Sequence, residues 1–393
     1  SCSLVGSEMC IRDSIATTGR RGPVLIDLPM NIQRSEVENP VYDMTFEDKH
    51  TDAAAAQQAA DTILEALEQA KRPVIMLGHG VDSSFSQQKL IRFAQKRQIP
   101  IITSVLAKSV LGYDHPLNFG CIGGAYGHRY ANMIANAKSD LLLCFGISLC
   151  TRQIGTKVHE FARGAKIIRI DIDPYNLQRD IHENGINEVK LQAETGAVID
   201  CLAKAAAPDT EGISDWLNVC TEIKENLQAV DDATPERYPN RMIADLSDML
   251  EDTSAIAVDV GQHMVWSYQS FKNHEGQKLL FSGGHGAMGY ALPAAIGAYY
   301  ATGKPVACIC GDGAFQMNIQ ELEWVKRENL PITMMVMNNH ALGMIRHLQR
   351  DYFEQVYADT SEGSGFSSCN FAEVAKAYGI SSACMEALSL IHI

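Results

Sequence analysis

Short apolar runs alternate with helical patterns along most of the chain. Buried strands are predicted where the apolar run is continuous, at residues 74–77, 101–104, 141–145 and 166–172. Helices are predicted where apolar residues recur every three or four positions, at 54–70, 86–98 and 130–137. Apolar strands separated by helices are typical of a parallel sheet covered on both faces. The sequence therefore predicts a doubly wound α/β domain over residues 54–207.

The same alternation returns after a charged, helical connector at residues 208–237. Strands are predicted at 254–258, 306–309 and 332–337, and helices at 287–301, 314–327 and 371–378. This pattern indicates a second parallel-sheet, doubly wound domain over residues 238–386. Ligands bind such sheets at the carboxyl ends of the strands. A site is therefore expected in the loops that follow 306–309 and 332–337.

Both ends of the chain differ in style from the remainder. Residues 1–14, SCSLVGSEMCIRDS, and 387–393, ALSLIHI, resemble translated sequencing adapter and are expected to be foreign to the protein. A real amphipathic start and a real short tail are the alternative.

A further apolar run, GPVLIDL at 22–28, is closed by Pro29. It is interpreted as the last buried strand of a domain whose earlier part is missing. The polar, irregular residues 31–53 are typical of a linker. Residues 15–45 are thus expected to be a remnant of that domain and its linker.

The net charge of the chain limits the kinds of molecule that it can be expected to bind. With 33 basic and 47 acidic residues the 393-residue chain carries a net charge of −14 and shows no basic stripe. This excludes a nucleic-acid or anionic-membrane partner. The uncharged stretch 286–303 is interrupted by glycine and proline, so it predicts a buried helix and not a membrane span.

The eleven cysteines are scattered, and none forms a CxxC pair. Cys308 and Cys310 stand two apart in an apolar run and are expected to be reduced thiols in the core. Such cysteine usage fits a reducing cytoplasm.

Two polar loops follow the strands predicted at 306–309 and 332–337, and they contain Gly311-Asp312-Gly313 and Asn338-Asn339. Asp312 and Asn339 are expected to converge, and their hard oxygens suit Mg²⁺ or Ca²⁺ together with phosphate oxygens. The two glycines leave room for a phosphate. The helix beginning near Ala314 directs free N–H groups to the same point. A lone Gly-Asp-Gly, however, is usually a simple turn.

The surrounding sequence resembles a known family. The string GDGAFQMNIQELEWVKRENLPITMMVMNNHALGM is similar to the thiamine-diphosphate signature, which begins with Gly-Asp-Gly and closes with Asn-Asn. DVGQHMVW at 259–266, SGGHGAMGYALPAAIGA at 282–298, RGPVLIDLP and KIIRIDIDP resemble segments of acetolactate synthase, also called acetohydroxyacid synthase. The resemblance covers nearly all of residues 15–386 and is to a large subunit truncated at both ends.

The resemblance implies a role for each matching residue. Asp312, Asn339 and the backbone carbonyl of Ala341 would bind Mg²⁺. The expected thiamine-diphosphate contacts are Gly261, Gln262 and His263 at the diphosphate, Gly311, Asp312, Gly313, Ala314 and Asn339 beside it, Gly286 and Met288 at the rings, and Met344 on the substrate side. Taken alone, His263 and Met288 would be ordinary core residues. Gln316 and Asn318 either line the site or cap the helix.

The implied activity is thiamine-diphosphate- and Mg²⁺-dependent decarboxylation of a 2-oxo acid, pyruvate, followed by carboligation to 2-acetolactate for branched-chain amino-acid synthesis. The family assembles each site between two subunits of a homodimer or homotetramer. Its activating glutamate lies in the amino-terminal domain, and no residue of this chain can be assigned to it. The chain alone is therefore expected to be inactive.

Two positions depart from the family pattern. In the stretch that binds FAD in the biosynthetic enzymes, Ser148 replaces the first arginine, both acids are gone, and only Arg152 remains. FAD binding therefore remains open, and these substitutions argue against it. Leu348 replaces a tryptophan that shapes the second-substrate pocket.

These departures keep other functions open. One alternative is a related thiamine-diphosphate-dependent lyase or decarboxylase acting on another 2-oxo acid or an aldehyde. Another is a non-catalytic cofactor-binding subunit. A nicotinamide dehydrogenase is disfavoured because no GxGxxG follows a first strand.

Overall fold

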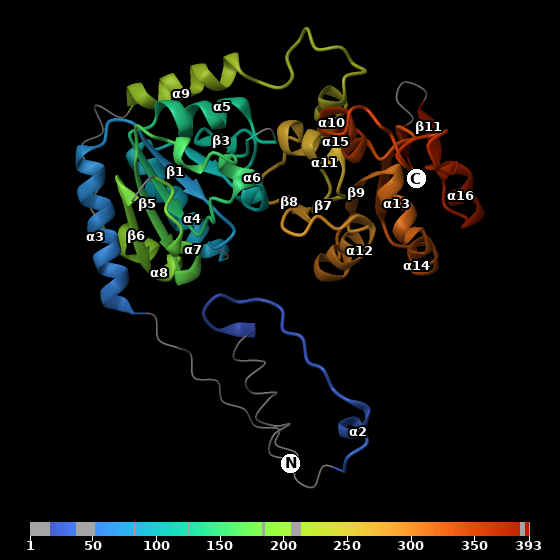
Figure 1. Cartoon of the computed structure of the whole chain (residues 1–393), viewed down its shortest axis with the longest axis horizontal. Coiled ribbons are helices and arrows are strands. Elements are labelled where there is room, and N and C mark those ends of the chain that lie inside the picture. The colour runs from blue at the N-terminus through green and yellow to red at the C-terminus, as the bar shows by residue number, and fades with distance from the viewer. Residues whose placement is uncertain are drawn as a thin grey trace.

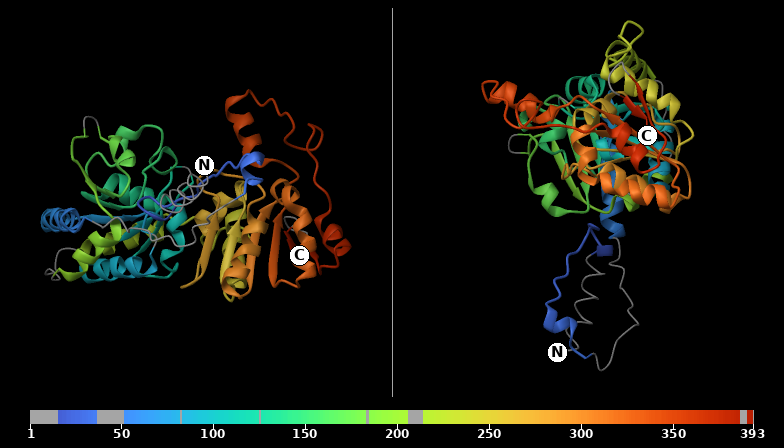
Figure 2. Two further views of the ribbon diagram at one scale, coloured as in Figure 1. Left: turned by 90° about the horizontal axis from the view of Figure 1, so that it is seen from below. Right: turned by 90° about the vertical axis from the view of Figure 1, so that its right-hand side faces the viewer.

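The computed structural model describes residues 16–36, 52–81, 83–124, 126–182, 185–205, 214–385 and 390–392. Two sheets of mainly parallel strands lie side by side, and each is covered by helices (Figure 1). A view turned by 90° shows the same separation into two bodies (Figure 2). The predicted α/β class with doubly wound middle and C-terminal domains is confirmed.

The first sheet contains six parallel strands in the order β3-β2-β1-β4-β5-β6. They are β1 (Pro73–Leu77), β2 (Ile101–Thr103), β3 (Asn118–Cys121), β4 (Leu141–Phe145), β5 (Lys166–Asp171) and β6 (Glu188–Gln192). The four strands expected from apolar runs are β1, β2, β4 and β5. The strand order reverses between β1 and β4. In open α/β sheets the loops that follow two such strands usually lead away from each other and leave a crevice for a ligand.

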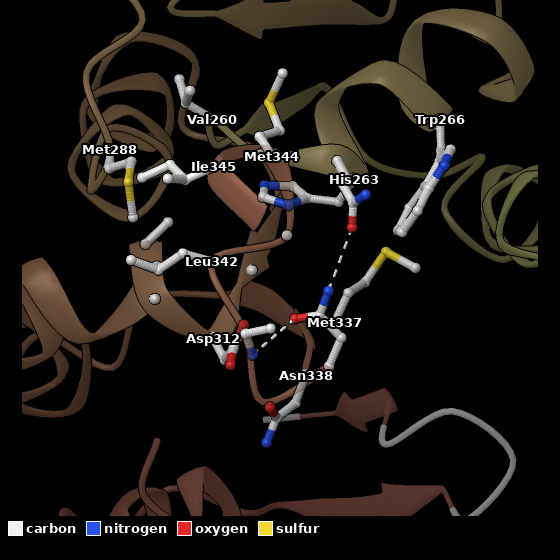
Figure 3. A pocket seen from close by; sticks show the side chains of 18 of the residues that line it. Val260, His263, Trp266, Met288, Asp312, Met337, Asn338, Leu342, Met344 and Ile345 are labelled. Carbon is white, nitrogen blue, oxygen red and sulfur yellow. Dashed lines mark hydrogen bonds between the residues drawn. The ribbon is translucent and has the colours of Figure 1, made fainter. Parts of the chain in front are cut away.

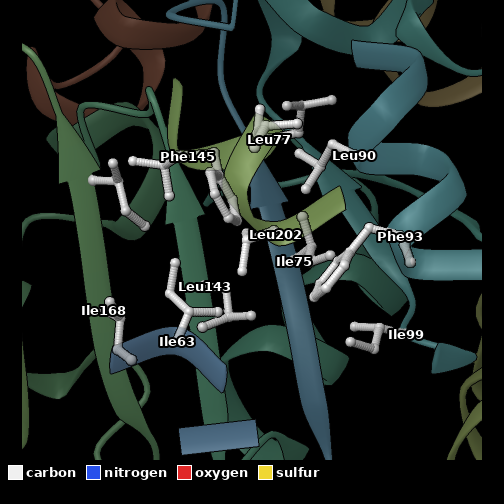
Figure 4. Packing of buried hydrophobic residues seen from close by; sticks show 14 of the residues in the cluster. Ile63, Ile75, Leu77, Leu90, Phe93, Ile99, Leu143, Phe145, Ile168 and Leu202 are labelled. Carbon is white, nitrogen blue, oxygen red and sulfur yellow. The ribbon is translucent and has the colours of Figure 1, made fainter. Parts of the chain in front are cut away.

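Each face of this sheet has its own core, because successive side chains of a strand point to opposite faces. Ile75 and Leu77 of β1 pack with helices α3 (Ala53–Gln69), α4 (Ser84–Arg97) and α8 (Thr195–Lys204), as Figure 4 shows. Val74 and Met76 pack on the other side with α5 (Arg129–Asn132), the π-helix Met133–Lys138 and α9 (Ser214–Asn226). The helical connector thus belongs to this core through Trp216 of α9.

The second sheet has the order β11-β12-β10-β9-β7-β8. Its parallel strands are β7 (Ala255–Val258), β8 (Lys278–Phe281), β9 (Val306–Gly311) and β10 (Ile332–Met337). The antiparallel strands β11 (Ala383–Met385) and β12 (Leu390–His392) extend it beyond β10. β12 lies within the tail expected to be foreign, and that interpretation stays a prediction.

Helices cover both faces of the second sheet as well. One core includes α12 (Ala291–Thr302), α14 (Leu322–Arg327) and α16 (Phe371–Ala377), and the other includes α10 (Pro239–Met249) and α11 (Gln262–Ser270). Cys308 and Cys310 of β9 are buried free thiols, as expected, and the nine cysteines of the described segments are all free. Within these segments no helix combines the length and apolarity needed to cross a membrane.

The buried strand expected at residues 22–28 is not found. This segment forms no regular secondary structure, and Leu25 is 94% exposed. A strand is stabilised by backbone hydrogen bonds to its neighbours, and none of the strands in the described ranges pairs with it. The short helix α2 (Met30–Gln33) follows, while residues 1–15 and 37–51 lie outside the described residues.

Two helices differ from their predicted form. The helix predicted at 287–301 is α12, which begins only at Ala291. It is buried on one face and exposed on the other, as the exposed Tyr300 shows. The helix expected at 314–327 is divided into α13 (Asp312–Phe315), a 3₁₀ helix (Gln316–Glu321) and α14. The interruption is at Asn318, whose non-helical backbone places its side-chain amide on the carbonyl of Gly289, at 2.6 Å.

Candidate functional site

A pocket of about 200 Å³ opens where β7, β9 and β10 end, at the edge of the second sheet (Figure 3). Its walls come from the loops after these strands, from the start of α11 and α15 (Gly343–Tyr352), and from the loop before α12. All twelve residues selected from the sequence line it: Gly261, Gln262, His263, Gly286, Met288, Gly311, Asp312, Gly313, Ala314, Asn339, Ala341 and Met344.

Asp312 is the first residue of α13 and is 2% exposed. Burial raises the pKa of its carboxyl group, while the backbone N–H groups of Gly313 and Ala341 and the nearby His340 lower it. Its Oδ2 atom is buried and has no hydrogen-bond partner within the described chain. A buried carboxylate oxygen without a partner is costly, so this atom suits a bound cation.

Asn339 follows β10 and approaches Asp312 through a shared neighbour. Its Oδ1 accepts a hydrogen bond from the backbone N–H of Ala341 at 3.1 Å, and the same N–H lies near the carboxylate of Asp312. His340, which lies between Asn339 and Ala341 in the chain, adopts a left-handed φ of 51° and turns the backbone there. The structure therefore brings the two side-chain oxygens together, as the strand positions predicted.

Asp312 offers a carboxylate, Asn339 an amide oxygen and Ala341 a backbone carbonyl, which are all hard oxygen groups. No cluster of three or more His, Cys, Asp or Glu side chains suited to a metal occurs among the residues that the structure places. A cation at Asp312 would thus need further oxygens from a ligand, such as phosphate oxygens. This is the coordination that Mg²⁺ commonly adopts with phosphates.

Three glycines keep the pocket open. A Cβ atom on Gly313 would lie 2.5 Å from Leu342 Cδ2, and one on Gly311 would lie 3.0 Å from the His263 ring. A Cβ atom on Gly343 would lie 2.1 Å from Gln262 Oε1. Each distance is shorter than a van der Waals contact, so glycine at these positions lets the lining side chains lie directly against the backbone.

His263 lies in the wall of the pocket on α11 and is almost fully buried. Burial lowers its pKa to about 4, and a hydrogen bond to the backbone of Asp259 opposes this only in part. The imidazole is therefore neutral at pH 7. Its Nε2 atom is buried and has no partner in the described segments, so it is available to a ligand.

A residue that the sequence did not single out, Asp259, fixes the loop before α12. Its Oδ1 accepts hydrogen bonds from the N–H groups of Val260 at 2.8 Å and Gly289 at 2.9 Å, and its Oδ2 accepts from Ala291 N–H at 2.8 Å. Met288 directly precedes the anchored Gly289 and faces Leu342 across the pocket (Figure 3). Its position directly after the buried strand β7 is the sequence feature that could have identified Asp259 as a site residue.

The remaining flagged residues lie outside the pocket lining. Gln316 donates to the carbonyl of Ser367, and Asn318 supports Gly289, so neither lines the site. Leu348 lies farther along α15 and is 52% exposed. Conversely, the apolar side chains of Val260, Trp266 and Ile345 line the pocket without having been predicted to do so.

Two domain families match this chain. The family "Thiamine pyrophosphate enzyme, central domain" matches residues 60–202. The family "Thiamine pyrophosphate enzyme, C-terminal TPP binding domain" matches residues 259–390, which contain nearly the whole pocket. Together the two matches span more than half of the chain.

Several curated proteins are similar over most of the chain. One is a "Probable acetolactate synthase large subunit" of Methanocaldococcus jannaschii, 33% identical over 385 residues, which cover 93% of this chain and 62% of the relative. Another is "Acetolactate synthase isozyme 2 large subunit" of Escherichia coli, 31% identical over 370 residues, with 93% and 64% covered. The "Acetolactate synthase large subunit" of Lactococcus lactis is 31% identical over 371 residues, with 93% and 62% covered. The chain thus spans less than two thirds of the length of these relatives.

Proposed function

The chain belongs to the thiamine pyrophosphate enzymes, and from this premise we propose that its pocket binds thiamine diphosphate through Mg²⁺. The protein ligands of the metal would be Asp312, Asn339 and the carbonyl of Ala341. The observation that carries the proposal is the buried, unpartnered Oδ2 atom of Asp312 beside Asn339. A cation there would satisfy this oxygen, and oxygens of the diphosphate would supply further ligands.

The other lining residues each have a role in this proposal. The diphosphate would lie along Gly261, Gln262 and His263, and along the backbone of Gly311 to Ala314, where side chains are absent or short. The neutral His263 ring donates one ring N–H to the backbone of Asp259, which leaves the buried Nε2 atom as a hydrogen-bond acceptor. It would therefore receive a hydrogen bond from a donor group of the ligand, while the ring lies beside the diphosphate without donating to it. Gly286 and Met288 would hold the ring region, and Met344 would face the substrate.

The cofactor, when bound, supplies the electron sink for decarboxylation of a 2-oxo acid. The chain's own residues hold it and shape its surroundings. The apolar side chains of Val260, Leu342 and Ile345 line the site. Once the site is closed, such a wall would shield the cofactor from water and strengthen electrostatic interactions there. Asp259 keeps the Met288 loop in place through two hydrogen bonds, from the backbone N–H groups of Gly289 and Ala291.

The reaction we propose is decarboxylation of pyruvate or a similar 2-oxo acid followed by carboligation, as in acetolactate synthase, in branched-chain amino-acid synthesis in the cytoplasm. The similarity to the acetolactate synthase large subunits described above supports it. The pocket of about 200 Å³ is smaller than the roughly 300–1,000 Å³ of sites that enclose a ligand. This supports a site completed by another subunit of a homodimer or homotetramer, and an isolated chain without activity.

We further propose that the central domain holds no FAD between β1 and β4. The loops after these strands are joined by backbone hydrogen bonds, Gly78 N–H to Phe145 O at 2.9 Å and Gly80 N–H to Gly146 O at 3.0 Å. A dinucleotide would need this crevice, which lies at the switch point of the strand order. The loss of the acids beside Ser148 agrees with this proposal.

Calorimetric titration with thiamine diphosphate and Mg²⁺ tests the cofactor site. We expect metal-dependent binding by the wild-type chain, loss of binding in Asp312→Ala, and retention in Asp252→Ala, which removes an exposed aspartate of the same domain. If the isolated chain does not bind, the titration is repeated with the full-length protein. Failure of the full-length protein to bind would overturn the proposal.

A further inference from the structure

We propose that Arg152 of the central domain is a positioning residue for the cofactor loop, defined here as residues 282–290. The inference rests on the proposed cofactor site, because this loop carries Gly286 and Met288 to the pocket. It assigns a role to the one arginine that remains of the flavin-binding stretch. In this role the central domain contributes to cofactor binding without touching the cofactor.

The contact joins the two domains directly. Arg152 lies on α6 (Thr151–Ile154), beside β8 in Figure 1, and its Nη1 donates to the carbonyls of Gly283 at 3.1 Å and Gly284 at 3.5 Å. Hydrogen bonds from a guanidinium are stronger than those between neutral groups. The first half of the cofactor loop is thus held by a side chain 131 residues earlier in the chain.

Packing reinforces the same contact. A Cβ atom on Gly283 would lie 3.1 Å from Leu106 Cδ2, so the side chain of Leu106 rests on the glycine backbone. Leu106 belongs to the 3₁₀ helix Val105–Val110 of the central domain. The central domain therefore contacts the cofactor loop through an apolar side chain as well as through Arg152.

The base of Arg152 is itself fixed. The turn before α6 receives hydrogen bonds from Arg179 to the carbonyls of Ser148 and Leu149, and Cys150 N–H donates to Gln153 Oε1 at 3.0 Å. Arg179 is the residue after α7 (Pro174–Gln178), on the far side of the turn. The guanidinium of Arg152 consequently extends from a braced turn and can restrain what it contacts.

The second half of the loop is held from within its own domain. Asp259 binds the N–H groups of Gly289 and Ala291, while Gly286 N–H donates to Ser282 O at 2.9 Å. Gly286 and Gly289 adopt φ values of +77° and +83°, which only glycine accepts readily. Met288 lies between these restraints, so its position depends on both Asp259 and Arg152.

Amide hydrogen exchange of the whole chain without added cofactor tests the restraint. In Arg152→Ala we expect the amides of Gly286 and Gly289 to exchange about threefold faster or more, the loss expected for one exposed hydrogen bond. Arg152→Lys should restore part of the protection. Arg163→Ala, which removes an exposed arginine of the same domain, should change nothing. Unchanged exchange in Arg152→Ala would overturn the proposal.

Thiamine-diphosphate affinity with Mg²⁺ provides the second readout. We expect Arg152→Ala to weaken it by about threefold or more and Arg152→Lys to recover part of the loss, since a preorganised loop binds more tightly. Faster exchange with unchanged affinity would refute the positioning role. A wild-type chain and a full-length protein that both fail to bind would contradict the proposed function instead, and the exchange data would still decide whether Arg152 restrains the loop. Faster exchange throughout β4 in Arg152→Ala would indicate that the whole central domain is destabilised. The proposal would then be judged on Arg152→Lys alone, which should still show partial protection of the loop.

Discussion

Gly343 and Gln262 approach each other so closely that the pocket has no room for a side chain between them. A Cβ atom on Gly343 would lie 2.1 Å from Gln262 Oε1 and 3.0 Å from Asn339 Nδ2. The two amide side chains are themselves joined, with Asn339 Nδ2 donating to Gln262 Oε1 at 3.4 Å. Gly343, at the start of α15, thereby leaves room for Gln262, a candidate for diphosphate binding, to contact Asn339, a candidate metal ligand.

We expect Gly343→Ala to weaken thiamine-diphosphate binding about tenfold while changing the free energy of unfolding by less than about 1 kcal/mol. The fold tolerates the change because Gln262 can rotate away, but the rotation removes its contact with Asn339. Calorimetry and thermal unfolding measure the two effects. Gly297→Ala is the control, because a Cβ atom there meets nothing within 4 Å. Equal affinities in both variants would disprove the prediction.

In the central domain the equivalent close approach is between two backbones. A Cβ atom on Gly78 would lie 2.0 Å from the carbonyl oxygen of Gly146. Since neither loop can yield without breaking its hydrogen bonds, we expect Gly78→Ala to lower the free energy of unfolding by about 3 kcal/mol. Urea unfolding followed by circular dichroism and fluorescence measures this. Gly164→Ala, where the added methyl group has open space, should unfold like the wild type.

The same loops bear on the flavin. Because they are joined by backbone hydrogen bonds, we expect the purified protein to show no flavin absorbance in the visible range and to gain none after incubation with FAD. Spectroscopy after removal of free FAD on a desalting column measures this, with a known flavoprotein treated in parallel. Stoichiometric flavin in the protein would show that the β1–β4 crevice opens.

Arg169 and Glu188 form a buried ion pair between β5 and β6. The distance between Nη1 and Oε1 is 2.7 Å, and the two side chains are 2% and 0% exposed. Glu188→Gln would leave the guanidinium charge buried without its partner, so we expect a loss of about 3–5 kcal/mol in the free energy of unfolding. Glu373→Gln removes one partner of the exposed pair with Lys376 and should cost less than about 1 kcal/mol. Similar losses in both variants would contradict this account.

The sequence predicted the central strands of both sheets and missed their edges. β1, β4 and β10 are continuous apolar runs because both of their faces are covered by helices. β6, with the sequence EVKLQ, and β3, with NFGC, are the edge strands of the first sheet. Polar residues are tolerated at an edge, so apolar runs do not reveal such strands.

The candidate site was predicted through residue types, and its supports were not. Asp312 and Asn339 stand at strand ends, where a local pattern is enough to suggest a shared site. Asp259 and Arg152 act on backbone atoms far away in the sequence, and no local pattern encodes that contact. The cofactor roles of the lining residues, and the domain limits at 54–207 and 238–386, stay predictions for experiment.

His263 allows a pH-dependent prediction. Burial lowers its pKa in the folded protein to about 4, whereas an exposed histidine of the unfolded chain titrates near 6.5. Between these values the unfolded state binds a proton that the folded state does not. The stability associated with neutral His263 is therefore fully present above about pH 6.5 and is lost as the pH falls through about 4.

We expect His263→Gln to remove this part of the pH dependence. Between about pH 7 and pH 4 the wild-type chain should lose about 3 kcal/mol more of its free energy of unfolding than the variant does, which corresponds to a pKa difference of about two and a half units. Urea unfolding at both pH values, without cofactor, measures the difference. His347→Gln, at an exposed position on α15, should follow the wild type, because folding does not bury this side chain. Parallel losses in wild type and His263→Gln would mean that the imidazole is hydrated or charged in the folded protein, and its proposed place as a neutral ring in the wall of the cofactor site would then have to be abandoned.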